Sequence, residues 1–132
     1  MKNLEIIRCS KEFWEFVRFL RTHPDTQNGF IQSSSISEID QIEYMNKNHM
    51  NYRICLLDKK PVGYFGVIND DIRICTHPDY QNKGIGLYML NELNKIWPNA
   101  IAKIKAENIS SIKLFEKAGF KKTFVFYENN VS

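Results

Sequence analysis

The chain has 132 residues, of which 43% are hydrophobic and 25% are charged, and its formal net charge is +3 at pH 7. These values are those of an ordinary soluble globular protein with a single core. The mild charge and the scattered basic residues do not indicate a nucleic-acid surface. We therefore expect one domain that spans residues 1–132 and has no nucleic-acid partner.

The three cysteines, Cys9, Cys55 and Cys75, are odd in number, far apart and without a C-x-x-C pair. This pattern predicts neither a disulfide framework nor a metal site, and a reducing cytoplasm is the simplest setting. The N-terminal apolar stretch is too short for a signal peptide, and no run approaches the roughly 20 apolar residues of a membrane span. We expect a cytoplasmic protein with no membrane partner.

Hydrophobic spacing divides the chain into short elements. Helical spacing is typical of residues 13–20, and Ser35-x-x-Glu38 has the form of a capping box that begins a second helix. Alternating segments follow, joined by the turn residues Asp58-Lys59-Lys60 and Asn69-Asp70. The predicted strands are 4–8, 52–57, 62–68, 72–76, 100–106 and 120–128, and the predicted helices are 10–21, 35–48, 84–97 and 110–118.

This element order, β-α-α-β-β-β-α-β-α-β, predicts an α/β fold with a mixed sheet flanked by helices. The three strands linked by hairpins should be antiparallel, and the strand–helix–strand unit from Ile72 to Ala106 should be a right-handed parallel crossover. The polar stretch from Asp25 to Ser34 is longer than a typical connection, and loops of this kind are often functional.

The segment Gln81-Asn82-Lys83-Gly84-Ile85-Gly86 lies between a predicted strand and a predicted helix. Its two glycines allow a tight turn and a close approach to a ligand, and the first N–H groups of the helix have no internal partners. The junction therefore suits a phosphate or pyrophosphate. A simple turn before a surface helix is the alternative. Met89 replaces the third glycine of G-x-G-x-x-G, and no Lys-Ser/Thr pair marks a P-loop.

Residues 77–86, His-Pro-Asp-Tyr-Gln-Asn-Lys-Gly-Ile-Gly, resemble the acyl-CoA loop of the GNAT superfamily of N-acyltransferases, written Gln/Arg-x-x-Gly-x-Gly/Ala. Residues 108–120 resemble the second mark of that family, an Asn, a small residue three positions on, and Leu-Tyr-Glu-Lys-x-Gly-Phe. The resemblance spans Val62 to Phe120. It implies a small single-domain member with a GNAT-like mixed sheet whose C-terminal strands are truncated, because the family usually has two strands after the last helix.

The resemblance also implies acetyl-CoA as the bound cosubstrate. The strand end would pair with the pantetheine arm like an added strand, the loop amides would hold the pyrophosphate, and Asn108 would hydrogen-bond the pantetheine. The implied cofactor-binding residues are Ile74, Cys75, Thr76, Gln81, Asn82, Lys83, Gly84, Ile85, Gly86, Leu87, Asn108, Ser111 and Phe115.

The chain departs from the family at Phe115, where many members have a Tyr that protonates the departing thiolate. Phenylalanine cannot donate a proton, so water or one of Tyr64, Tyr80 and Tyr127 would have to replace it. Asp70, Asp71 and His77 are the candidate catalytic bases, with turn or solvated-loop roles as their alternatives.

The acceptor side is expected from the first two helices and their connection, by analogy with the family. Its candidate residues are Trp14, Arg18, Asp25, Asn28, Phe30 and Gln32. The expected function is transfer of an acetyl group to the primary amine of a small polar molecule, such as an aminosugar or its nucleotide, by direct attack in a ternary complex. A protein or peptide acceptor, a non-catalytic acyl-CoA-binding module and an unrelated nucleotide-binding domain are the alternatives. An exposed sheet edge favours a homodimer.

Overall fold

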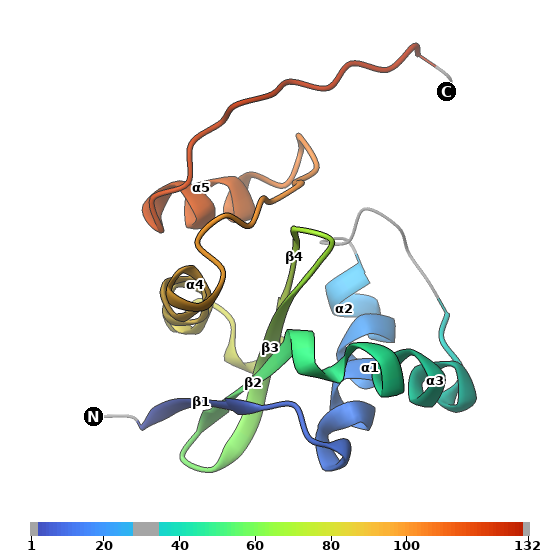
Figure 1. The fold of residues 1–132 in the computed structure, drawn as a ribbon. Coiled ribbons are helices and arrows are strands. Elements are labelled where there is room, and N and C mark those ends of the chain that lie inside the picture. The colour runs from blue at the N-terminus through green and yellow to red at the C-terminus, as the bar shows by residue number, and fades with distance from the viewer. Residues whose placement is uncertain (1–2, 28–34, 131–132) are drawn as a thin grey trace.

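The computed structural model describes residues 3–27 and 35–130. They form a twisted sheet with α1, α2 and α3 on one face and α4 and α5 on the other (Figure 1). The helices and strands in chain order are β1 (Leu4–Arg8), α1 (Trp14–Thr22), α2 (Pro24–Gln27), α3 (Glu38–Asn48), β2 (Tyr52–Leu57), β3 (Lys60–Ile68), β4 (Asp71–Thr76), α4 (Ile85–Ile96) and α5 (Ile109–Lys117), with 3₁₀ turns at Lys11–Phe13, His49–Asn51 and Pro78–Tyr80.

Within the described residues, the sheet has the strand order β1-β2-β3-β4, and every neighbouring pair is antiparallel. The predicted hairpins are therefore confirmed. Asp58 and Lys59 have positive φ angles, as do Asn69 and Asp70. A tight two-residue turn whose twist matches that of the flanking strands requires positive φ at both central residues. Both turns therefore join their strands directly.

The strand–helix–strand connection is parallel, as predicted, but the second strand is much shorter than expected. Ile72 N donates to Ile101 O at 2.9 Å, and Ile101 N donates to Asp70 O at 2.8 Å. This is an isolated parallel bridge, and residues 102–106 form no further ladder within the described part of the chain. The prediction of a strand over 100–106 is wrong because the backbone leaves β4 after Ile101.

The prediction of a last strand over 120–128 is also wrong. Residues 121–130 are extended but exposed, and no described strand lies beside them. Their sequence has the right pattern, but a strand needs a partner for its backbone N–H and C=O groups. Pattern alone could not show that this partner is absent from the fold.

Helix starts differ from the predictions by a few residues. Ser10 precedes a 3₁₀ turn, and α1 begins at Trp14. The cap of α3 is Ser37, whose hydroxyl accepts from Asp40 N at 3.1 Å, so the capping box predicted from Ser35 was placed two residues early. Asn108 caps α5 in the same way. Pro24 begins the short α2 within a stretch predicted to be a loop.

The sheet separates two hydrophobic clusters. One lies under α1 and α3 and includes Leu20 and Met45; the other lies under α4 and α5 and includes Phe65, Met89 and Leu93. All five side chains are fully buried. Burial of each contributes about 1.5–3 kcal/mol, so the two clusters hold the helices against the sheet and fix the positions of their ends.

Candidate active site

A cleft of about 1130 Å³ runs between the end of β4, the start of α4 and the start of α5. This volume exceeds the roughly 300–1,000 Å³ of most small-molecule sites, so two ligands could occupy it together. It is lined on one side by residues from the α1–α2 corner and on the other by residues 102–108. The predicted cofactor residues that line it are Ile74, Cys75, Thr76, Gln81, Asn82, Gly84, Ile85, Gly86, Leu87, Asn108, Ser111 and Phe115.

The N-terminus of α4 forms one part of the cleft. Gly84 is its N-cap with φ +81° and makes no side-chain cap, and the first backbone bond of the helix runs from Tyr88 N to Gly84 O at 3.1 Å. The N–H groups of Ile85, Gly86 and Leu87 therefore precede the helical ladder and carry the positive end of its dipole. An anion in the cleft would find donors here without a competing side-chain cap.

Two glycines keep this end of the helix open in different ways. A Cβ atom at Gly84 would meet nothing within 4 Å, so the positive φ angle is what requires glycine there. A Cβ atom at Gly86 would lie 3.0 Å from Cδ2 of Leu114. Gly86 therefore lets α4 pack closely against α5, whose Leu114 also lines the cleft.

The outer edge of β4 forms a second part of the cleft. Ile72 N points away from β3 toward Ile101 O, and backbone groups two residues apart on a strand face the same edge. The N–H and C=O groups of Ile74 and Thr76 therefore face the side where residues 102–106 have left the sheet. This edge can accept one extended amide-containing chain.

Asn108 lies across the cleft from this edge. Its Oδ1 accepts from Ser111 N at 3.2 Å, which caps α5, and its backbone N donates to Lys105 O at 2.9 Å. The capping bond uses the side-chain oxygen and leaves the amide NH₂ as a donor. The predicted Asn108 and Ser111 are therefore brought together, with Ser111 acting through its backbone.

Tyrosines and a buried thiol form the end of the cleft nearest α1. Tyr64 lies opposite Cys75 in the β3–β4 register, and Tyr52 OH and Tyr44 OH are 2.7 Å apart. Burial raises the pKa of the Cys75 thiol to about 12 and raises the pKa of Tyr64 well above its usual value. Both groups are therefore protonated at neutral pH.

Charged side chains of both signs line the cleft. Asp71 at the start of β4 forms an ion pair with Lys103, with Oδ2 and Nζ 3.2 Å apart. Asp25 lines the cleft from α2, and Arg73 lines it from β4. Arg21 lies with its guanidinium 5.1 Å from the centre of the Tyr44 ring. The mixture suits a polar, charged ligand better than an apolar one.

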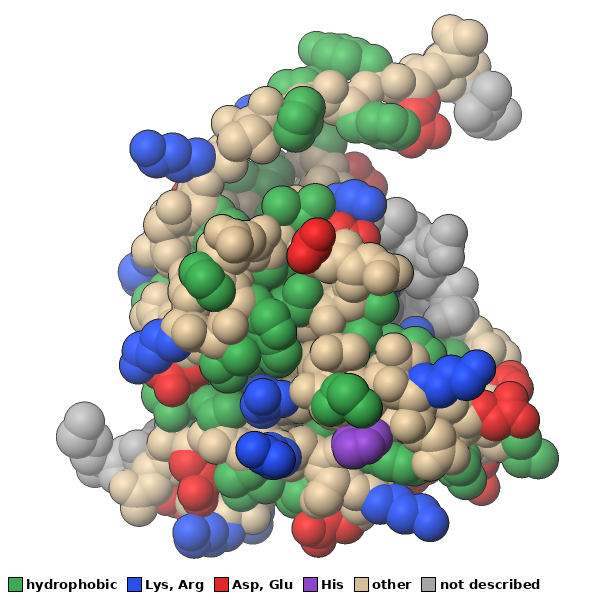
Figure 2. Space-filling view, viewed as in Figure 1, with side chains coloured by type: hydrophobic (Ala, Val, Ile, Leu, Met, Phe, Trp, Pro, Cys, Tyr) green, Lys and Arg blue, Asp and Glu red, His purple; other side chains and the backbone are tan. Residues whose placement is uncertain are grey.

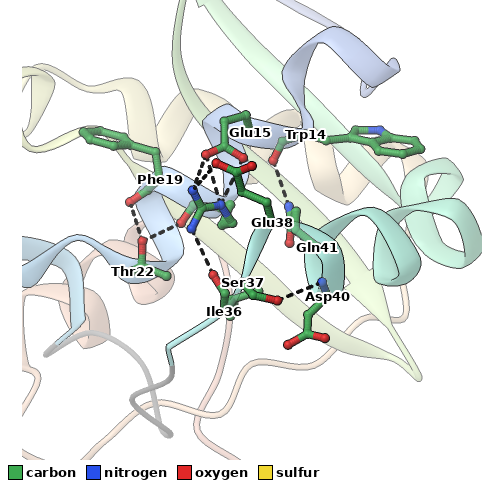
Figure 3. Close-up of polar contacts among 10 residues, drawn as sticks. Trp14, Glu15, Phe19, Thr22, Ile36, Ser37, Glu38, Asp40 and Gln41 are labelled. Carbon is green, nitrogen blue, oxygen red and sulfur yellow. Dashed lines mark hydrogen bonds and ion pairs between the residues drawn. The ribbon is translucent and has the colours of Figure 1, made fainter.

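Some predicted residues do not line the cleft. Trp14 is buried in the core, where its Nε1 donates to Cys9 O. Arg18 on α1 contacts Glu15, Glu38 and the carbonyl of Ile36, and Figure 3 shows these three partners close together. These contacts give both side chains structural partners outside the cleft.

Two candidate bases and one loop residue also lie elsewhere. Asp70 is exposed in the β3–β4 turn. His77 accepts from Asp79 N at 3.1 Å and lies against the Phe19 and Tyr80 rings, outside the cleft lining. Lys83 is exposed beside the loop. Asn28, Phe30 and Gln32 lie outside the described residues.

Sequence reasoning missed several residues that line the cleft. They are Arg21, Thr26, Tyr52, Arg73, Lys103, Lys105, Glu107 and Ser110. Arg21 and Thr26 come from the far face of the sheet, and Tyr52 from a strand not next to β4. The alternation along β4 could have found Arg73, because it puts Arg73 on the same face as Cys75. The other residues could be assigned to the cleft only once the packing of separate elements was known.

The described residues form neither a metal cluster nor a membrane-spanning helix. Among residues 3–27 and 35–130, no group of three or more His, Cys, Asp or Glu side chains could hold a metal ion. In the same part of the chain, no helix has the length and hydropathy needed to cross a bilayer.

The family is shown by sequence. The model of the acetyltransferase (GNAT) domain matches residues 48–122, which is more than half of the chain. The chain therefore belongs to the GNAT acetyltransferase family, as the motif resemblance predicted. No curated protein matches it.

Solved structures show the same fold. A domain from Methanocaldococcus jannaschii is 27% identical with a TM-score of 0.81, covering 98% of this chain and 95% of that chain. Spermidine N-acetyltransferase from Vibrio cholerae, solved with CoA and spermine, is 18% identical with a TM-score of 0.75, and the match covers 92% of this chain and 82% of that chain. The yncA protein of Salmonella typhimurium, solved with acetyl-CoA, is 17% identical with a TM-score of 0.77, and the match covers 92% of this chain and 81% of that chain. The predicted fold class is thus confirmed.

Proposed function

We propose that this protein transfers an acetyl group from acetyl-CoA to a primary amine of a small polar molecule, within a single domain that spans residues 1–132. The observation that carries the proposal is the convergence of the uncapped α4 N-terminus and the open β4 edge on one cleft. The first suits a pyrophosphate, and the second suits the amide-containing pantetheine arm. Cys9, Cys55 and Cys75 are all free, which fits a reducing cytoplasm.

The residues present fit this ligand. The amides of Ile85, Gly86 and Leu87 would hold the pyrophosphate, and the edge of Ile74 and Thr76 would pair with the pantetheine. The free amide NH₂ of Asn108 would donate to the same arm from the opposite wall. Bound acetyl-CoA supplies an activated thioester carbonyl, and the chain supplies binding and orientation.

Direct attack by the amine is favoured over an acetylated enzyme. The one thiol that lines the cleft belongs to Cys75, and burial raises its pKa to about 12. A thiol in its protonated form is a poor nucleophile, because the thiolate is the reactive species. We therefore propose that donor and acceptor occupy the cleft together.

Asp71 and two tyrosines are the proposed proton-transfer groups. Asp71 lines the cleft but lies four residues before Cys75. At ~3.3 Å per residue this separation is about 13 Å along the strand. Asp71 would therefore accept the proton of the amine through water. Tyr64 and Tyr80 also line the cleft, whereas Tyr127 is 88% exposed on the C-terminal segment. We propose that Tyr64 or Tyr80 replaces the proton donor missing at Phe115, because both line the cleft.

The acceptor is proposed to carry negative charge as well as its amine. Arg21 and Arg73 line the cleft near Tyr52, and Asp25 lines the same cleft. Arginines bind phosphate or carboxylate groups, and an aspartate binds an ammonium group. An aminosugar nucleotide has both features and is the first acceptor to test. Trp14, Arg18, Asn28, Phe30 and Gln32 stay predictions for this side.

Isothermal titration of acetyl-CoA tests the cofactor site. In Gly84→Glu a negative side chain would stand at the α4 N-terminus, so we expect binding at least about tenfold weaker, or ~1.4 kcal/mol. Gly119→Glu is the matched control, because Gly119 also has a positive φ angle, open space around its Cβ position and no place in the cleft lining. Equal affinity in both folded variants would contradict the proposed pyrophosphate site, and no binding by the wild type would overturn the function.

A second candidate function is a non-catalytic acyl-CoA-binding module. Phe115 is buried in the cleft wall and has no proton to donate, which favours this alternative. Release of CoA thiol during incubation with aminosugar nucleotides, amino acids or peptides separates the two. Thiol release that depends on a small amine supports the enzyme, release with peptides alone indicates a protein acceptor, and tight binding without release supports the module.

A further inference from the structure

Residues 81–84 connect the 3₁₀ turn Pro78–Tyr80 to α4, and all four are exposed. The side chains of residues 81–83 make no hydrogen bond or ion pair with any other described residue. The connection is therefore held from its two ends, by α4 on one side and by the 3₁₀ turn on the other. Gln81, Asn82 and Gly84 line the cleft, so whatever fixes the turn also fixes this part of the cleft wall.

The residue that fixes the turn is His77. Its Nδ1 accepts from Asp79 N at 3.1 Å, and its carbonyl oxygen accepts from Tyr80 N at 2.9 Å. Pro78 has no N–H group, so Asp79 N is the first backbone donor of the turn, and a side-chain acceptor at this place acts as a cap. One residue thus closes the turn with both its side chain and its backbone.

The imidazole of His77 is held by rings from two elements. The Phe19 ring of α1 is stacked on it, with centroids 5.7 Å apart and planes 26° from parallel. The Tyr80 ring meets it edge-on, at 5.6 Å and 76°. Aromatic pairs in these geometries are stabilising beyond the area that they bury. The two contacts restrict rotation of the imidazole, and so they keep Nδ1 directed at Asp79 N.

The turn transmits this restraint to the cleft. Tyr80, Gln81 and Asn82 come directly after the capped residues and line the cleft, whereas Phe19 and His77 do not. Phe19 is 45% exposed on α1. Because neither ring is part of the lining, both can affect a bound ligand only through the turn.

The same hydrogen bond argues against His77 as the catalytic base. A neutral imidazole has one nitrogen with a free lone pair and one that carries the proton. In His77 the nitrogen with the lone pair is Nδ1, and its lone pair already accepts from Asp79 N. The role of this side chain is therefore sought in the turn.

We propose that His77 is a positioning residue whose imidazole, oriented by Phe19, fixes the turn that places Tyr80 and the loop of the acetyl-CoA site. The inference rests on the proposed function, because it concerns the binding of that cosubstrate. Molecules in which the turn is open bind the pyrophosphate poorly. The apparent dissociation constant of acetyl-CoA therefore rises as the fraction of molecules with a closed turn falls.

Isothermal titration of acetyl-CoA into two variants of His77 separates its acceptor from its ring. His77→Asn keeps a side-chain acceptor that can cap the N–H group two residues on, and it lacks the ring. His77→Phe keeps a ring and lacks the acceptor. We expect His77→Phe to weaken binding at least about threefold, and His77→Asn to keep the affinity within about twofold of the wild type.

A variant of Phe19 tests the contact from α1. Phe19→Ala removes the ring that orients the imidazole, so we expect acetyl-CoA binding at least about threefold weaker. The same change beside His77→Asn should have no effect, because an asparagine cap does not need the ring. Ile39→Ala is the matched control and should leave binding unchanged. Hydrophobic side chains also reach the surface over α3 (Figure 2), and Ile39 is 70% exposed there.

Urea denaturation of each variant shows whether it is folded. Loss of binding in Gly84→Glu together with unchanged binding in His77→Phe and Phe19→Ala would overturn the positioning role and leave the proposed function in place. Equal losses in His77→Asn and His77→Phe, or a Phe19→Ala effect that persists beside His77→Asn, would also overturn it. If His77→Phe does not fold, Phe19→Ala compared with Ile39→Ala decides. A wild type without affinity for acetyl-CoA would overturn both this role and the proposed function.

Discussion

At the scale of single residues, backbone conformation and close packing explain why three glycines occupy their positions. Gly84 has a positive φ angle with open space around it, whereas Gly63 would place a Cβ atom 2.8 Å from the carbonyl oxygen of Cys75. Gly66 would place one 2.4 Å from Asn51 O. Any side chain at Gly63 or Gly66 must displace backbone, so these two glycines let the strands of the sheet and its neighbours approach closely.

Cys75 provides a test of the direct mechanism at the same scale. Because burial keeps its thiol protonated, Cys75→Ala should change kcat by less than about tenfold, or ~1.4 kcal/mol. Steady-state assays and intact-mass measurement after incubation with acetyl-CoA check this. Cys55→Ala is the control for loss of a buried cysteine, since Cys55 lies in the cluster on the other side of the sheet. A covalent acetyl group on Cys75 would contradict direct transfer.

At the scale of elements, helix ends decide which polar groups face the cleft and which are satisfied internally. Ser37 and Asn108 cap α3 and α5 with side-chain oxygens, whereas α4 begins at a glycine with no side-chain cap. A cap satisfies the free N–H groups of a helix, and its absence leaves them to a ligand. Both α4 and α5 begin at the cleft, and of these two helices α4 is the one without a side-chain cap on its first amides.

The position of the α3 cap gives an element-scale prediction. Ser37→Ala removes the acceptor for Asp40 N and should lower the free energy of unfolding by about 1 kcal/mol. Ser35→Ala should change it by less than about 0.5 kcal/mol, because Ser35 is exposed and precedes the cap. Urea denaturation of both variants gives the comparison. A larger effect at Ser35 would place the cap where the capping-box pattern predicted it.

At the scale of the whole molecule, burial of the three thiols couples stability to pH. Burial raises the pKa of Cys9, Cys55 and Cys75 from an ordinary value near 9 to about 12. Above pH 9 the unfolded chain releases protons that the folded chain keeps. The stabilisation is therefore fully present below pH 9 and is lost as the pH rises from 9 toward 12.

The free energy of unfolding should accordingly fall between pH 9 and pH 11. Each thiol contributes up to about 1.4 kcal/mol per pH unit to this fall. Cys55→Ala should reduce the slope by up to that amount while lowering stability at pH 8, because it also removes buried volume. Urea denaturation at several pH values checks the slope, and equal slopes in the two proteins would contradict the assignment.

The amino-acid sequence was sufficient for features that depend on neighbouring residues. Alternation and turn residues located β2, β3 and β4, and the strand-to-helix junction at Gly84 located the start of α4. The two motifs identified the family that the domain match then confirmed. These features could be predicted because a hairpin, a helix start or a glycine loop is specified by residues within a few positions of one another.

Tertiary structure alone decided features that depend on distant segments. Residues 102–106 leave the sheet after Ile101, and residues 121–130 have no strand beside them, although both segments have strand patterns. Arg21 and Tyr52 reach the cleft from elements that the chain order does not place near β4, while Arg18 is held outside it. A segment becomes a strand only where another backbone satisfies its hydrogen bonds. A side chain lines the cleft only where the packing of the elements directs it there. Neither condition depends on neighbouring residues in the sequence.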